Sequence, residues 1–261
     1  MGKVEAVIFD WAGTTVDYGC FAPVQAFKDA FNVYGLEPTN DQIRQPMGKL
    51  KIDHIKTMLK MPSINQEFIK RYNRDFNDED VNKIYKLFEK SLMSQIVNHT
   101  KVKPYVLETV KKLKEMRIKI GSTTGYTDMM MAPVLKSAKK QGYVPDCWYS
   151  PDSTNNIGRP YPYMIFKNMM TLNISSVRNV IKVGDTISDI QEGTNAGVVV
   201  VGVIEGSSLL GLNEKEFELL SDYERTRVVA KVKEAYLMAG ADFVINNLSE
   251  LIDVIKEVEL F

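Results

Sequence analysis

The first apolar run of the chain, residues 4–9, has the length and composition of a buried β-strand, and it ends at Asp10. The next comparable run is at residues 117–122. A right-handed strand–helix–strand crossover needs only about 30 residues, far fewer than separate these two runs. The excess predicts a domain inserted after the first strand.

The inserted segment has a helical pattern throughout. Residues 22–34 carry apolar side chains at helical spacing and are followed by Gly35, a residue typical of the position just beyond a helix. Residues 50–59 form a second amphipathic pattern, and residues 78–96 form a third with one apolar face. We therefore expect an α-helical cap at residues 20–100, above the carboxyl end of the first strand.

Strand and helix patterns alternate after the cap. Strand-like runs occur at residues 117–122, near 148–149, and at 180–183, 198–203 and 242–245. Helical patterns occur at residues 105–116, 127–141, 161–172, 187–196 and 222–239, followed by a last helix. This order predicts a doubly wound parallel α/β sheet, formed by residues 1–19 and 101–261. Residues 205–223 are the one loop-rich stretch.

Composition and charge exclude several classes of function. The 33 lysines and arginines balance 33 acidic residues, so no net field attracts nucleic acid or an acidic membrane. The longest apolar run, residues 196–204, is too short to cross a bilayer, and we see no signal-peptide pattern. The two cysteines, Cys20 and Cys147, suit a reducing compartment. We expect a cytoplasmic protein without nucleic-acid or membrane partners.

Familiar nucleotide and zinc motifs are absent from the sequence. It contains no Gly-x-x-x-x-Gly-Lys-Ser/Thr, and no Gly-x-Gly-x-x-Gly follows a predicted strand. With only His54, His99 and two distant cysteines as ligands, we do not expect a structural zinc site.

Acidic residues follow two of the predicted strands. Asp10 ends the first strand, while Asp185 and Asp189 follow the strand at residues 180–183, where a helix begins. Such carboxylates can simply cap the helix. In parallel sheets, however, strand ends meet at one edge, so the three acids would converge. Their repulsion favours a bound cation, and Mg²⁺ is the natural one because it prefers oxygen ligands.

Two further segments have features of an anion site. Residues 122–126, Ser-Thr-Thr-Gly-Tyr, follow a strand and open a helix, where free amide groups and the helix dipole favour phosphate. Taken alone, the segment favours a plain helix cap by Thr124 or Thr127. Arg159, between Gly158 and Pro160, has the planar guanidinium that suits phosphate, but alone it would be a surface arginine.

Residues 9–15, Phe-Asp-Trp-Ala-Gly-Thr-Thr, resemble the first motif of the haloacid dehalogenase superfamily. In that motif an aspartate attacks phosphorus and a second acid, two residues later, serves as acid and base. Here Ala12 stands at the second position. Residues 46–54, Pro-Met-Gly-Lys-Leu-Lys-Ile-Asp-His, extend the likeness. From residue 4 to about 250, the chain resembles the phosphonoacetaldehyde hydrolase branch, which cleaves a carbon–phosphorus bond with a Schiff-base lysine in its cap.

The resemblance implies a role for each matched residue. It implies Asp10 as nucleophile, Lys51 as Schiff base and His54 as a proton carrier. It implies Mg²⁺ held by Asp10, Asp185 and the Ala12 carbonyl, with Asp189 orienting groups around them. The residues implied to bind substrate are Thr124, Gly125 and Arg159 at the phosphoryl group, and Met47, Cys20, Tyr126 and His54 at the aldehyde end.

The resemblance also implies a homodimer formed through the cap. The helix at residues 22–34 is a candidate contact, with Phe21, Phe27 and Phe31 as candidate exposed aromatic residues. The implied partner of the site is a small phosphonate. Opening and closing of the cap would admit this substrate and then exclude water.

The absence of an acid at position 12 and the presence of a Schiff-base lysine can both be explained by a change of leaving group from oxygen to carbon. A phosphate ester releases an alkoxide that benefits from a proton, whereas a phosphonate releases carbon. An imine with a lysine provides an electron sink, so that the departing pair becomes an enamine. Among Lys49, Lys51, Lys56 and Lys60, the resemblance selects Lys51. If one helix runs through this segment, Met47, Lys51 and His54 share a face.

The resemblance thus predicts hydrolysis of phosphonoacetaldehyde to acetaldehyde and phosphate, through a lysine imine and an aspartyl-phosphate, in the degradation of 2-aminoethylphosphonate. Two alternatives stay open. One is a magnesium-dependent phosphomonoesterase or sugar-phosphate mutase of the same superfamily. The other is a phosphate-binding relative that lost catalysis together with the second acid.

Overall fold

A computed structural model describes residues 3–260 and contains one five-stranded parallel sheet. Its order is β2-β1-β3-β4-β5. The strands are β1 (Ala6–Phe9), β2 (Lys119–Ser122), β3 (Val180–Gly184), β4 (Val199–Val203) and β5 (Phe243–Ile245). The chain reverses its winding direction between β1 and β3, so the fold is the doubly wound α/β fold that the sequence predicts. Residues 1–2 and 261 of the predicted core segments lie outside the described residues.

Helices cover both faces of the sheet because its central strands are apolar on both faces. Val7 and Phe9 of β1 face one apolar cluster, while Ala6 and Ile8 face another. The first face packs against α6 (Val106–Glu115), α7 (Asp128–Lys140) and α12 (Leu251–Leu260). The opposite face packs against α8 (Tyr163–Thr171), α9 (Ile187–Ala196) and α11 (Asp222–Met238).

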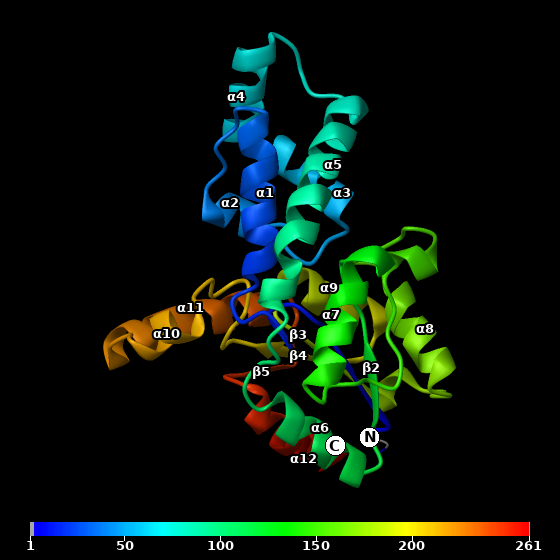
Figure 1. Cartoon of the computed structure of the whole chain (residues 1–261). Coiled ribbons are helices and arrows are strands. Elements are labelled where there is room, and N and C mark those ends of the chain that lie inside the picture. Colours follow the sequence, from blue (N-terminus) through cyan, green and yellow to red (C-terminus); the bar gives the residue numbers. More distant parts are fainter. Residues whose placement is uncertain (1–2, 261) are drawn as a thin grey trace.

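The inserted segment forms a helical bundle that stands above the carboxyl ends of the strands (Figure 1). We call this bundle the cap. Its helices are α1 (Phe21–Val33), α2 (Asn40–Arg44), α3 (Lys51–Leu59), α4 (Pro62–Tyr72) and α5 (Asp78–Gln95). The long helices α1 and α5 lie side by side along the bundle. The three helices expected from periodicity are present, and α2 and α4 are additional.

Two linkers join the cap to the sheet, and they are hydrogen-bonded to each other. The Lys103 amide donates to the Thr15 carbonyl at 2.9 Å, and the Asp17 amide donates to the Lys101 carbonyl at 3.2 Å. The Asp17 carboxylate caps α1 by accepting from the amides of its first two residues. The same carboxylate lies 3.3 Å from Nδ1 of His99 in the returning linker. The two linkers therefore act as one connection.

The proposed exposure of the aromatic residues on α1 is wrong. Phe27 and Phe31 are both 0% exposed, and Phe21 is half-buried. The Phe27 ring stacks between His54 and Phe88, at centroid distances of 3.9 and 4.2 Å. Because α1 is covered by the helices around it, these rings form the interior of the cap. The exposed apolar side chain on α1 is that of Val33, which is 68% exposed.

Three local expectations also differ from the structure. Residues 148–149 do not form a strand. Tyr149 makes only an isolated bridge, with Thr123, the residue just beyond the end of β2. The stretch 205–223 contains a short helix, α10 (Glu214–Glu218), which begins with a complete capping box at Asn213. Met47 lies outside α3, which starts at Lys51 after a turn at Gly48. In residues 3–260, no helix has the length and apolarity required to cross a membrane.

Candidate active site

Three carboxylates meet where the winding of the sheet reverses. Asp10 follows β1, Asp185 follows β3, and Asp189 lies in the first turn of α9. One oxygen from each lies within 4.8 Å of the others, and all three residues are buried. Burial and the neighbouring acid Asp189 raise the pKa of Asp10. Burial and the neighbouring Asp10 raise the pKa of Asp185 well above its ordinary value.

The loop after β1 is shaped to bring Asp185 close. Its turn is closed by the Gly13 amide, which donates to the Val16 carbonyl at 2.7 Å. Gly13 has φ +89°, and a Cβ there would lie 2.1 Å from Oδ2 of Asp185, so only glycine fits. The Thr14 hydroxyl donates to Oδ1 of Asp185 at 3.1 Å. The buried Lys103 donates a hydrogen bond from its Nζ to the Gly13 carbonyl, which fixes the position of the loop.

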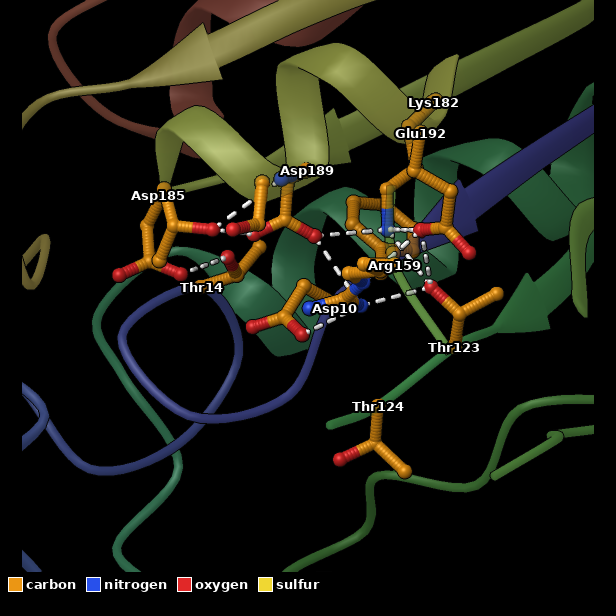
Figure 2. A network of polar contacts seen from close by, with 12 residues as sticks. Asp10, Thr14, Thr123, Thr124, Arg159, Lys182, Asp185, Asp189 and Glu192 are labelled. Atoms are coloured by element: carbon orange, nitrogen blue, oxygen red, sulfur yellow. Dashed lines mark hydrogen bonds and ion pairs between the residues drawn. The ribbon is translucent and has the colours of Figure 1, made fainter. Parts of the chain in front are cut away.

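Two buried cations hold the acids together (Figure 2). Arg159 Nη2 lies 2.7 Å from Oδ1 of Asp10 and 3.0 Å from Oδ1 of Asp189, while its Nε lies 2.9 Å from Glu192. Lys182 Nζ lies 2.9 Å from Asp189 and 3.2 Å from Glu192. The Arg159 side chain is 1% exposed, so it belongs to this network and is no surface arginine.

Sequence reasoning missed Lys182 and Glu192, which complete the network. The signal for Lys182 was present, since it is the one charged residue inside the apolar run of β3. A charge in a fully buried strand needs a partner, and Lys182 is 0% exposed. Glu192, one turn beyond Asp189 on α9, gave no such signal because helices commonly carry glutamate on exposed faces.

The donor set fits a divalent cation. Arg159 and Lys182 contact Asp10, Asp189 and Glu192. Within the described residues, Asp185 is hydrogen-bonded to neutral donors alone, the Thr14 hydroxyl and the Ser208 amide. Among residues 3–260, no hydrogen bond reaches the Ala12 carbonyl. Oxygen ligands of this kind suit a hard cation such as Mg²⁺.

A small cavity lies between the acids and the cap. It is lined by Asp10, Ala12, Cys20, Pro23, Met47, Gly48, Lys51, Thr124, Gly125, Tyr126, Arg159 and Thr186. The structure thus brings together nine of the residues that the sequence singled out. Its volume of about 20 Å³ holds roughly one water molecule. The cap is therefore closed on the core, and a substrate requires it to open.

The closed cap rests on the core through its loop before α3. The Ser188 hydroxyl of α9 donates to the Met47 carbonyl at 2.9 Å. A Cβ on Gly125 would lie 2.7 Å from the Gly48 carbonyl, so glycine allows this close approach. Thr127 caps α7, while the Thr124 hydroxyl accepts from the Tyr126 amide at 3.1 Å. Thr124 and Gly125 therefore line the cavity beneath the cap loop.

Lys51 is the first residue of α3 and reaches the cavity from the cap. It is 3% exposed, and its Nζ lies 5.0 Å from the centroid of the Tyr126 ring. Burial lowers the pKa of Lys51 to about 8. The acids Asp10 and Asp185 and the Cys20 thiol favour its protonated form, and Arg159 opposes it. The amine is thus easier to deprotonate than an exposed lysine.

His54 lies on α3 but does not line the cavity. Its Nε2 is 2.8 Å from the Ile43 carbonyl, an acceptor, so this nitrogen carries the proton. Burial and the positive charge of Lys51 lower the pKa of His54 well below its ordinary value. His54 is therefore a neutral imidazole, and its buried Nδ1 has no hydrogen-bond partner within the described chain.

Comparisons with known proteins agree on one family. A family model described as haloacid dehalogenase-like hydrolase matches residues 7–203. The chain is 49% identical over 249 residues to the phosphonoacetaldehyde hydrolase of Lysinibacillus sphaericus, covering 95% of this chain and 93% of that protein. It is 48% identical to the phosphonoacetaldehyde hydrolase of Parabacteroides distasonis, covering 99% and 98%. A crystal structure of a phosphonoacetaldehyde hydrolase-like protein from Oleispira antarctica has a TM-score of 0.95 at 36% identity, covering 99% and 94%.

The buried network predicts a large loss of stability when one cation is removed. Lys182→Met keeps the volume of the side chain but leaves Asp189 and Glu192 without one of their two cations. We expect the free energy of unfolding to fall by about 3–5 kcal/mol, measured by urea denaturation at pH 7. Lys139→Met on the exposed end of α7 is the control and should change little. A loss below about 1 kcal/mol for Lys182→Met would contradict this energetic role.

Proposed function

Since the chain belongs to the haloacid dehalogenase-like hydrolases and, within them, to the phosphonoacetaldehyde hydrolase family, we propose that it hydrolyses phosphonoacetaldehyde to acetaldehyde and phosphate. One observation carries the proposal. A buried lysine from the cap, Lys51, and a buried aspartate from the core, Asp10, line the same cavity beside Ala12. A carbonyl-reactive amine and a phosphorus nucleophile are the two groups that this reaction needs.

In the proposed first step, the neutral amine of Lys51 attacks the aldehyde carbon, and loss of water gives an imine. The lowered pKa of Lys51 supports this step because the amine must be unprotonated. From its place one turn along α3, we also propose that His54 moves protons to and from the Lys51 nitrogen during formation and hydrolysis of the imine, although its lowered pKa makes the protonated form costly. Met47, Cys20 and Tyr126 surround the aldehyde end.

In the second step, a carboxylate oxygen of Asp10 attacks phosphorus and the carbon–phosphorus bond breaks. The bonding pair moves into the protonated imine and gives an enamine. Arg159, Thr124 and Gly125 bind and neutralise the phosphoryl oxygens. Protonation of the enamine carbon and hydrolysis of the imine release acetaldehyde and restore Lys51. Water then cleaves the aspartyl-phosphate, which releases phosphate and restores Asp10.

We propose that Asp10, Asp185 and the Ala12 carbonyl hold Mg²⁺, with Asp189 orienting Arg159 and Lys182 behind them. When bound, this ion offsets the charge shared by Asp10 and the phosphoryl group as they approach each other. We further propose that the protein is a cytoplasmic enzyme of 2-aminoethylphosphonate degradation and forms a homodimer through the cap, as the family resemblance implies. We assign residues 1–19 and 101–261 to the core domain and residues 20–100 to the cap domain.

Asp10→Asn should abolish phosphate release, by at least about a thousandfold, because the amide is a poor nucleophile. Formation of the imine should persist, since Lys51 is supplied by the cap. The measurements are phosphate release and the mass added by borohydride reduction with phosphonoacetaldehyde. Asp41→Asn, at an exposed position on α2, is the control. Near-normal turnover of Asp10→Asn would show that another group attacks phosphorus.

Lys51→Arg should lose nearly all carbon–phosphorus cleavage and all borohydride trapping, because a guanidinium keeps charge but forms no imine. Lys49→Arg, in the loop just before α3 and outside the cavity lining, should stay close to wild type. If Lys51 serves only as a charged clamp, Lys51→Arg should instead stay within about tenfold, a loss of about 1.4 kcal/mol. That result would favour the phosphomonoesterase or mutase alternative. A wild-type protein that binds phosphate but shows neither turnover nor borohydride trapping would favour the other alternative, a phosphate-binding relative that has lost catalysis.

The pH dependence of trapping should report the pKa of Lys51. Below this pKa the amine is protonated and cannot attack, so the initial rate of borohydride trapping should rise with pH. We expect the half-maximal rate near pH 8, where burial places the pKa of Lys51. For an exposed lysine, the half-maximal rate would lie at about pH 10.4. A midpoint above pH 10 would mean that the cavity does not desolvate this amine.

A further inference from the structure

Arg44 is a buried cation by which the cap reaches the core. It ends α2 and is 9% exposed. Its Nη1 donates to the Gly19 carbonyl at 2.7 Å and to the Ser208 carbonyl at 3.0 Å. The Cζ atom of its guanidinium lies 5.0 Å from the centroid of the Phe21 ring, above the ring face. In residues 3–260, Arg44 makes no ion pair with a carboxylate; it donates to the two backbone carbonyls and, at 3.4 Å, to the Ser208 hydroxyl.

Ser208 connects this contact to the acidic cluster. Its amide donates to Oδ2 of Asp185 at 2.7 Å, while its carbonyl accepts from Arg44. It lies in the loop after β4, where a turn is closed by the Ser207 amide donating to Ile204 and the Gly211 amide donating to Ser207. The two oxygens of Asp185 are thus held from two sides, by Thr14 and by Ser208.

We propose that Arg44 is a positioning residue that couples closure of the cap to the placement of Asp185. With the cap closed, Arg44 fixes Ser208, and the Ser208 amide then sets the Oδ2 atom of Asp185 for the cation. With the cap open, Arg44 leaves, the loop loosens, and the metal site loses one of its two constraints on Asp185. This inference rests on the proposed function, because it assumes that Asp185 is a ligand of Mg²⁺.

The chemistry of Arg44 makes its contact specific for the closed state. A guanidinium loses hydration when it is buried, and it recovers that loss only where acceptors stand in the right places. Gly19 belongs to a linker and Ser208 to the core, so both acceptors are in place only when α2 rests on the sheet. The contact of Ser188 with Met47 is a second link between the cap and the metal-binding segment. It reaches α9, and it does not touch Ser208.

The test compares Mg²⁺ binding by the wild type, Arg44→Met and Arg71→Met. Arg71 is exposed on α4, so its replacement removes the same charge from the cap without a contact to the core. Calorimetric titration with Mg²⁺ is carried out with and without saturating inorganic phosphate, the product of the proposed reaction. We expect Arg44→Met to bind Mg²⁺ about tenfold more weakly in at least one condition, a change of about 1.4 kcal/mol. Arg71→Met should match the wild type.

A second readout follows the loop itself. Hydrogen exchange measured by mass spectrometry should show faster exchange of the peptide covering residues 204–211 in Arg44→Met, and unchanged exchange in the strand β3. A merely structural role would lower the unfolding midpoint and leave the Mg²⁺ affinity of the folded protein unchanged. If Arg44→Met does not fold, Arg44→Lys, which keeps the charge but reaches fewer acceptors, should bind Mg²⁺ with intermediate affinity.

The outcomes separate this inference from the proposed function. Absence of Mg²⁺ binding and of turnover in the wild type would overturn the proposed function. Normal turnover in the wild type, with equal Mg²⁺ affinity and equal exchange at residues 204–211 in Arg44→Met, would overturn the coupling alone.

Discussion

The mutual repulsion of four buried carboxylates is the constraint on which the site depends. Asp10 and Asp185 come from neighbouring strands, and Asp189 and Glu192 come from one helix, so the parallel topology itself forces them together. Arg159 and Lys182 offset part of this charge through contacts of 2.7–3.2 Å. Because these cations are themselves nearly fully buried, neither set of charges is tolerable without the other. Asp185, which no cation contacts within the described residues, leaves a cluster of acidic oxygens able to bind a metal ion.

The second requirement is a site built from two parts of the chain. The proposed nucleophile, Asp10, follows a strand of the sheet, whereas the Lys51 amine belongs to the cap, and both line one cavity in the closed structure. The same closure desolvates Lys51, which lowers the pKa of its amine and favours the form that attacks an aldehyde. In the proposed mechanism, closure of the cap on the substrate and activation of the lysine are therefore linked.

The sequence predicted the elements whose pattern is local and missed contacts that depend on the fold. An apolar run ending in Asp10, and the strand before Asp185, located the site because strand ends meet at one edge. Lys182 was missed although its position inside a buried strand signalled it. The sequence shows that a helix has an apolar face but not which neighbouring helix covers it. Phe27 was therefore expected at the surface and His54 at the aldehyde end, whereas the two rings stack inside the cap. The role of Arg44 could not have been found, since its hydrogen-bond partners, Gly19 and Ser208, belong to distant segments.

Ala12 connects these features in the mechanism that we propose. It lines the cavity beside Asp10, and the group proposed to bind the cation is its backbone carbonyl, which does not depend on an acidic side chain. An acid at this position would stand near Lys51 and favour its protonated form, as Asp10 and Asp185 already do. The amine needs the opposite influence. A leaving group on carbon gains nothing from a proton donated to oxygen, and it gains much from an imine. In the proposed reaction, the alanine in the core and the lysine in the cap therefore both suit a leaving group on carbon.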